Sequence, residues 1–160
     1  MPPYISRIEG RTLHEGAHMR PHYATDKDWP EVEALLSAAS LNVDGIREKI
    51  GEYIVVRDNA GILGCAGIER YETTGVLRAL AVAQRGRSAG LGEFLLSAVV
   101  ADVRQQGVES IVLQTRTASG YFARLGFMPV SISDLPPAVR PSRAINPDLA
   151  DAGTLMQIAL

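Results

Sequence analysis

The chain has 160 residues, of which 46% are apolar and 21% charged, so it fits one globular domain and is not wholly disordered. Its 16 basic and 18 acidic residues give a net charge of −2, which argues against a strongly basic nucleic-acid-binding protein. No apolar run approaches the ~20 residues of a membrane span, a single cysteine excludes a disulfide framework, and no residues are spaced as in a zinc site. We therefore expect a cytoplasmic protein with no nucleic-acid or membrane partner and no metal.

Residues 1–19 differ from the rest of the chain and are left out of the fold argument. They are polar, lack helical or strand periodicity, and contain Ile-Glu-Gly-Arg at 8–11, a protease-recognition sequence used to remove purification tags. Two interpretations stay open: the segment is vector-derived, or it is a native disordered arm. Residues 20–160 then form a single folded domain.

The first elements of this domain are predicted to be a short strand and two helices. Residues 19–24 are strand-like, and apolar residues at helical spacing predict an amphipathic helix over 29–40. Pro30 and Glu31 stand where a first helical turn favours proline and acid. A second, short helix is expected over 44–50.

An antiparallel meander follows, because tight turns separate three strand-like segments. The predicted strands are residues 53–57, 62–71 and 76–82, and the turns are 58–61 and 73–75. The rest of the chain alternates helices and strands: a helix over 93–107, a strand over 110–114, a helix over 117–125, and strands at 127–130 and 154–159. The order is that of a mixed α/β layer architecture.

The most informative stretch is Val76–Gly92, in which a strand runs into a glycine-containing loop that opens a helix. The first N–H groups of a helix have no internal partner, and together with the helix dipole they attract an anion such as phosphate. Gly90 and Gly92 let a phosphate approach the backbone, and Arg85 and Arg87 add positive charge. The nucleotide P-loop and dinucleotide-binding glycine motifs are both absent.

The loop 87–92, Arg-Ser-Ala-Gly-Leu-Gly, resembles the Arg/Gln-x-x-Gly-x-Gly/Ala loop of the GNAT family of N-acetyltransferases, which binds the pyrophosphate of acetyl-CoA. The stretch 118–127, with its closing Gly-Phe, resembles the family's second motif, so the resemblance covers roughly residues 20–160. It implies a mixed, mostly antiparallel sheet that is splayed between its fourth and fifth strands and flanked by helices. The pantetheine arm of acetyl-CoA would enter this gap.

The resemblance also implies which residues hold acetyl-CoA, without a metal. They are Leu80, Ala81, Val82, Arg87, Ser88, Ala89, Gly90, Leu91, Gly92, Thr115 and Phe122. A backbone N–H near Ala81 or Val82 would polarise the thioester carbonyl, and the acceptor amine would attack directly. Many relatives have a tyrosine acid where this chain has Phe122. The adjacent Tyr121 is a candidate acid, and unaided departure of the thiolate is the alternative.

For the general base we favour Glu69, with Glu72 second and water as a third route. A solvent-facing structural role for Glu69 is the competing interpretation. Arg78 lies on the central strand, and period 2 places Leu80 and Val82 on the same face. It either binds the carboxylate of an acceptor or is paired to a carboxylate such as Glu69. Arg116, just after a strand, is a second acceptor candidate.

Several stretches resemble narrower branches of the family. Cys-Ala-Gly-Ile-Glu-Arg-Tyr at 65–71 and the segments 76–82 and 112–127 are similar to acetyltransferases of arsenic-resistance operons, and 112–140 is similar to the acetyltransferase domain of N-acetylglutamate synthases. Both imply a small-molecule amine acceptor, an amino acid or its analogue. The C-terminal segment 143–160 departs from both. A homodimer is an expectation from the resemblance alone.

Other functions stay open at this stage. The missing tyrosine keeps a non-catalytic acyl-CoA-binding module in consideration. Acetylation of a protein N-terminus or of an antibiotic amine is a further alternative. Cys65, within an apolar strand, is expected to be a core residue rather than a nucleophile.

Overall fold

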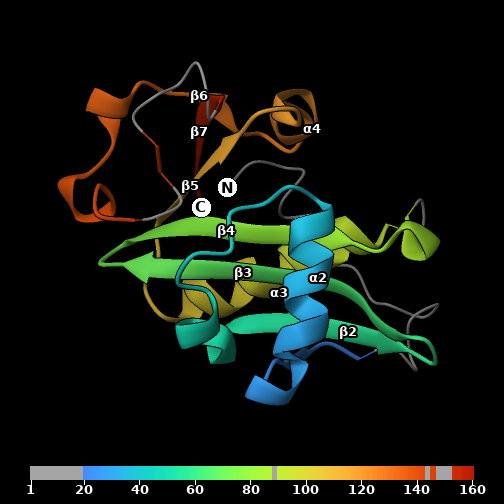
Figure 1. Cartoon of the computed structure of the whole chain (residues 1–160). Helices are drawn as coiled ribbons and strands as arrows, with labels where there is room; N and C mark the ends of the chain where they lie inside the picture. Colours follow the sequence, from blue (N-terminus) through green and yellow to red (C-terminus); the bar gives the residue numbers. More distant parts are fainter. Residues whose placement is uncertain (1–19, 88–89, 143–144, 147–152) are drawn as a thin grey trace.

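A computed structural model of the chain describes residues 20–87, 90–142, 145–146 and 153–160, and it is built on one seven-stranded sheet (Figure 1). The strands run in the order β1–β2–β3–β4–β5–β7–β6 across the sheet. Their bounds are β1 His22–Tyr23, β2 Tyr53–Asp58, β3 Gly61–Tyr71, β4 Thr74–Val82, β5 Ser110–Thr115, β6 Met128–Pro129 and β7 Thr154–Ala159. The expected mixed, mostly antiparallel sheet is confirmed, and the parallel pair is β4 with β5.

The helices lie close to the predicted segments: the first ends two residues early, the second is shifted two residues toward the N-terminus, and the third is shorter at both ends. The α-helices are α2 Trp29–Ala38, α3 Leu91–Gln105 and α4 Ser119–Arg124. Short 3₁₀ turns are η1 Asp26–Asp28, η2 Arg47–Glu52, η3 Gln84–Gly86, η4 Ile132–Asp134 and η5 Pro137–Val139. The helix predicted over 44–50 is therefore the 3₁₀ segment η2, displaced toward the C-terminus. No helix in the described part of the chain is long and apolar enough to cross a membrane.

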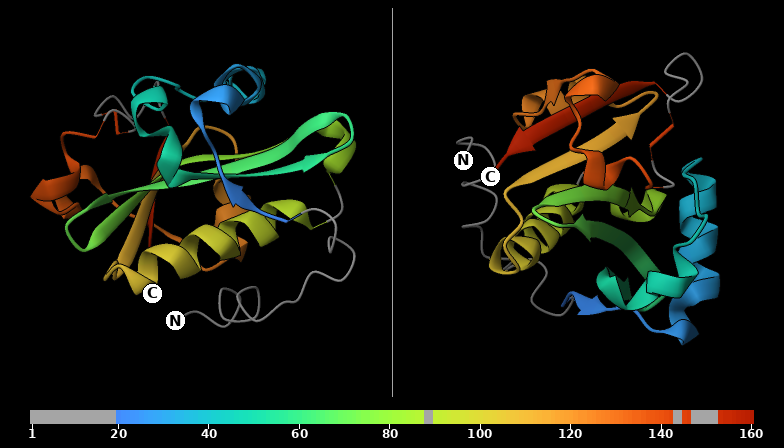
Figure 2. Two further views of the ribbon diagram at one scale, coloured as in Figure 1. Left: turned by 90° about the horizontal axis from the view of Figure 1, so that it is seen from below. Right: turned by 90° about the vertical axis from the view of Figure 1, so that its left-hand side faces the viewer.

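Helices cover both faces of the sheet (Figure 2). Helix α3 packs on one face, where Leu95, Leu96 and Val99 are buried against β3 and β4. Helix α2 and η2 cover the opposite face, where Val32 and Leu36 lie in a second buried cluster. The apolar side chains of α3 recur at helical spacing, so the sequence pattern accounts for the face that the helix buries.

Strands β4 and β5 separate soon after they meet. They pair only over Thr74–Val76 with Ser110–Val112, whereas β5 pairs with β7 along its whole length. From Leu77 to Val82, β4 therefore has a strand neighbour on the β3 side, and no strand of the described residues pairs with it on the β5 side. The expected splay is confirmed, and Figure 2 shows β5 diverging from the meander.

A β-bulge at Arg78 changes which side chains share a face. Gly67 lies opposite Ala79 while Ile68 lies opposite Leu77, so Arg78 is the extra residue of β4. Arg78 consequently points to the α2 face, where it contacts the α2–η2 loop, whereas Leu80 and Val82 pack in the cluster on the α3 face. The prediction that these three side chains share one face is wrong, because the bulge interrupts the two-residue period.

Gly67 is required by close packing against Tyr53. A Cβ at this position would overlap the Tyr53 ring, which is fully buried and hydrogen-bonded to Glu69. We expect Gly67→Ala to lower the free energy of unfolding by about 2–3 kcal/mol, because a packed core tolerates added volume poorly. In a thermal melt this corresponds to a fall in Tm of roughly 4–12 °C. Gly51→Ala is the control, since a Cβ there meets nothing within 4 Å; an equal loss in both variants would contradict the packing argument.

Candidate active site

A cavity of about 330 Å³ occupies the gap between β4 and β5. Its walls come from β4, β5, α4, the start of α3 and the α2–η2 loop. The predicted site residues that line it are Arg78, Leu80, Val82, Gly92, Thr115, Tyr121 and Phe122. Residues from three distant parts of the sequence thus meet where the sheet opens, as a ligand site requires.

The backbone of β4 presents alternate residues to this gap. Ala83 donates its N–H to the carbonyl of Leu63 on β3 at 2.8 Å, and the carbonyl of Ala81 also lies toward β3. By the alternation of a strand, Leu80 and Val82 direct their backbone groups to the open side. Of the two predicted N–H positions, Val82 therefore lies on the open side and Ala81 does not, and the Ala81 side chain packs in the α2-side cluster.

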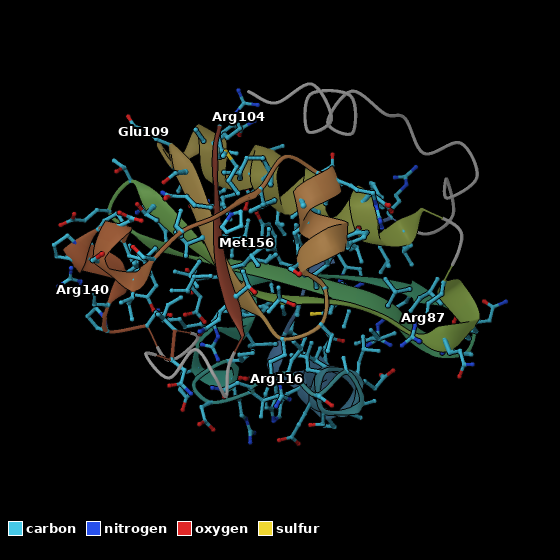
Figure 3. The ribbon with its side chains drawn as sticks, turned by 90° about the horizontal axis from the view of Figure 1, so that it is seen from above. Arg87, Arg104, Glu109, Arg116, Arg140 and Met156 are labelled. Carbon is cyan, nitrogen blue, oxygen red and sulfur yellow. The ribbon has the colours of Figure 1, made fainter. Side chains whose placement is uncertain are left out.

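Helix α3 begins at the end of the cavity. Gly90 has a φ of 73°, a left-handed conformation that favours glycine, and the helix starts at Leu91. The N–H groups of its first turn are available to an anion, and Arg87 stands exposed beside η3 (Figure 3). Ser88 and Ala89, which belong to the predicted loop, lie outside the described residues.

Arg85 is engaged elsewhere. Its guanidinium binds both carboxylate oxygens of Asp58, at 2.8 and 2.9 Å, and this pairing lowers the pKa of Asp58 to about 2. The sequence argument counted Arg85 and Arg87 together as positive charge for the anion. The structure leaves this role to Arg87, whose Nε donates to the carbonyl of Val82 at 3.2 Å.

Tyr121 and Phe122 stand in the cavity wall on α4. Phe122 is buried and stacks edge-to-face with Phe127. The Tyr121 hydroxyl lies 3.5 Å from an ideal Cβ position on Gly92, so it faces the start of α3. This is the end of the cavity where the pyrophosphate is expected, away from the middle of β4.

Glu69 is buried in a network on the other side of β4, and its side chain is 2% exposed. Its Oε2 accepts from the Tyr53 hydroxyl at 2.8 Å and from Arg78 at 3.2 Å, and its Oε1 accepts from the Tyr71 hydroxyl at 3.2 Å. Burial and the Glu69 charge raise the pKa of Tyr53. The Arg78–Glu69 pairing, one of the two alternatives for Arg78, is thus present.

A second cavity of about 240 Å³ adjoins this network. Glu69, Tyr71, Arg78 and two residues of η2, Glu48 and Lys49, are in its wall, and Arg78 lines both cavities. Lys49 was missed by the sequence argument. The one feature of the sequence that could have drawn attention to Lys49 is its rarity, since Lys27 and Lys49 are the only two lysines of the chain.

Three further residues considered in the sequence analysis line neither cavity. Glu72 is exposed in the β3–β4 turn with a φ of 58°, and Arg116 is exposed on the loop that follows β5 (Figure 3). Cys65 is fully buried, and burial raises the pKa of its thiol to about 12, as expected for a core residue.

Solved structures share this fold. N-acetylglutamate synthase from Neisseria gonorrhoeae, complexed with coenzyme A and N-acetyl-glutamate, superposes with a TM-score of 0.75 at 20% identity and covers 89% of this chain and 35% of that chain. An acetyltransferase of the GNAT family from Staphylococcus aureus gives a TM-score of 0.71 at 19% identity over 89% of this chain and 99% of that chain.

Among curated proteins, the chain is 35% identical over 85 residues to the amino-acid acetyltransferase of Pectobacterium atrosepticum. The match covers 52% of this chain and 19% of that protein, so the chain spans about a fifth of the length of such relatives. It is also 30% identical over 87 residues to an uncharacterized N-acetyltransferase of Chlorobaculum tepidum, covering 54% of this chain and 56% of that protein.

The family model described as an acetyltransferase (GNAT) domain matches residues 49–129, just over half of the chain. This range contains β2 to β6, with both strands of the splayed pair, the loop before α3 and the cavity wall on α4. The expectation of an acetyl-CoA-dependent N-acetyltransferase is thereby confirmed at the level of the family. The chain belongs to the GNAT family of acetyltransferases.

Proposed function

We propose that this protein transfers the acetyl group of acetyl-CoA to the primary amine of a small molecule, an amino acid or an amino-acid analogue. The observation that carries the proposal is the cavity between the parted strands β4 and β5, which ends at the start of α3. The names of its relatives, amino-acid acetyltransferase and N-acetylglutamate synthase, support the acceptor class.

In this proposal, acetyl-CoA lies along β4. Its pyrophosphate binds the first-turn N–H groups of α3 and Arg87, at a helix start suited to anions. Its pantetheine amides pair with the outward backbone groups of Leu80 and Val82, as an added strand would. Thr115 and Phe122 form the facing wall. One of the two outward N–H groups then polarises the thioester carbonyl.

The proton transfers need few side chains. The Tyr121 hydroxyl faces the start of α3, so we assign it to the cosubstrate-binding end rather than to thiolate protonation. A thiol pKa of ~8.5 allows the thiolate to leave unaided. The described residues that line the gap include neither a carboxylate nor an imidazole. Glu69 is buried and already accepts three hydrogen bonds, so the geometry favours water over Glu69 as the proton acceptor.

Release of coenzyme A, detected with a thiol reagent across a panel of amines, tests the activity. The panel holds glutamate, the other amino acids, phosphinothricin, a polyamine and an aminoglycoside. We expect turnover on one or more amino acids or their analogues. If acetyl-CoA raises the Tm but no amine is acetylated, the non-catalytic acyl-CoA-binding alternative is favoured instead.

The proposed cosubstrate loop is tested by Gly90→Glu. The new side chain places negative charge at the start of α3, so the Kd for acetyl-CoA should rise roughly tenfold or more in calorimetry, about 1.4 kcal/mol or more of binding free energy. Gly107→Glu is a matched control, because Gly107 also has a positive φ, 93°, and follows the opposite end of α3 in open space. Equal losses of affinity in both variants would contradict the proposal that acetyl-CoA binds beside Gly90.

The water route makes a prediction about pH. If no enzyme carboxylate limits the reaction, kcat/KM should rise with pH until the acceptor amine itself is deprotonated. For an acceptor with an α-amine of pKa ~8, kcat/KM should then reach its plateau about two pH units lower than for an alkyl amine of pKa ~10.4. The same breakpoint for both acceptors would point to a titrating group of the enzyme.

A further inference from the structure

The second cavity has a cation whose hydrogen-bonding capacity is largely unused, the ammonium of Lys49. We propose that Lys49 binds an anionic group of the acceptor, carried at a distance from the reacting amine, and so determines acceptor specificity. The inference rests on the proposed transfer to a small amine. It assigns a second, remote recognition point to the same acceptor.

The other charged groups deep in this cavity are already bound. Glu69 accepts from Tyr53 and Arg78 on one oxygen and from Tyr71 on the other, which uses most of the lone pairs of a carboxylate. Arg78 donates from Nη1 to Glu69, and from Nη2 to the carbonyls of Asn42 at 3.3 Å and Asp44 at 2.7 Å. The buried pair neutralises itself and fixes the α2–η2 loop.

Lys49 differs from this pair in exposure and in contacts. Its side chain is 43% exposed, and its Nζ forms an ion pair with Glu69 Oε1 at 3.8 Å, a separation longer than a hydrogen bond. The ammonium also stands 5.3 Å from the centre of the Tyr71 ring, which holds a cation by its π face. A primary ammonium has three N–H donors, so Lys49 can accept a carboxylate without breaking a short hydrogen bond.

The charge of the wall is consistent with one incoming anion. Once the Glu69–Arg78 pair is set aside, Lys49 and Glu48 remain, both on η2. Both side chains are exposed, so solvent screens both charges. Lys49 lies beside Glu69 and Tyr71, and apart from the buried Arg78 it is the cation in the cavity wall that an entering anion can meet.

The register of the sheet sets how far this anion lies from the amine. Glu69, which Lys49 approaches, is opposite Val76, while the proposed thioester position is at Leu80 or Val82. The backbone positions of Val76 and Leu80 are four strand residues apart, roughly 10 Å or more along β4, and we take this spacing as the separation of the anion from the amine. An α-carboxylate, one carbon from its amine, does not span this distance. The acceptor class is thus a primary amine with an oxyanion several bonds away.

A series of linear amino acids measures this separation. Glycine, β-alanine, γ-aminobutyrate and ε-aminocaproate are compared as acceptors with their neutral amides, at one pH, for the wild type and Lys49→Met. We expect Lys49→Met to lower kcat/KM about tenfold or more for the longest carboxylates. It should change kcat/KM for glycine and the amides, and the KM for acetyl-CoA, by less than about twofold.

Lys27→Met, at an exposed position on η1 that lines neither cavity, is the matched control and should change none of these values. Thermal melts of both variants check that folding is retained. An equal effect of Lys49→Met on carboxylates and amides, or no effect on either, overturns the inference while leaving the transfer activity in place.

If none of the probes is acetylated, their binding to the coenzyme A complex is measured by calorimetry. Carboxylate binding that is lost in Lys49→Met but kept in Lys27→Met upholds the Lys49 site and counts against the proposed transfer. Absence of binding by every carboxylate probe overturns the Lys49 site.

Discussion

The β-bulge at Arg78 is the constraint on which the arrangement of the site depends. A bulge adds a residue to one strand, bends it and increases its twist. Here it lies between the part of β4 that pairs with β5 and the part that borders the gap. It also places Arg78 on the α2 face and leaves Leu80 and Val82 on the α3 face. One extra residue thus places the Arg78–Glu69 network on one face of the sheet and the side chains of Leu80 and Val82 on the other.

The buried pair of Arg78 and Glu69 holds the acceptor side together. Both side chains are 2% exposed, so each has lost its hydration, and removal of one partner would cost roughly 3–5 kcal/mol. Tyr53, Tyr71 and two backbone carbonyls satisfy the remaining hydrogen-bonding groups. An Arg78→Ala variant therefore changes stability, loop position and acceptor binding at once. Lys49, half-exposed and loosely held, is the cleaner position at which to separate binding from folding.

Much of the fold follows from the sequence because it depends on local periodicity. Apolar spacing predicted α2 and α3, and tight turns predicted the meander, whereas the parting of β4 and β5 was implied only by the resemblance to the GNAT family. The bulge was not predictable, because the run Arg-Ala-Leu-Ala-Val alternates as a regular strand does. The pairing of Arg78 with Glu69 was one of the predicted alternatives, whereas the pairing of Arg85 with Asp58 and the approach of Lys49 to Glu69 were missed for another reason. Asp58 and Lys49 come from separate elements, and nothing in the spacing along the chain states that they meet.

In the proposed reaction, the charged groups of acetyl-CoA and of the acceptor bind at opposite ends of the two cavities. Arg87 and the α3 start meet the phosphates at one end, and Lys49 meets an acceptor oxyanion at the other. The stretch of β4 between them is lined largely by apolar side chains and outward backbone groups. An ammonium entering this stretch loses hydration, which lowers the pKa of the amine and favours the neutral form. Both reactants are then held by their distant charges, while the reacting amine and thioester meet as neutral groups.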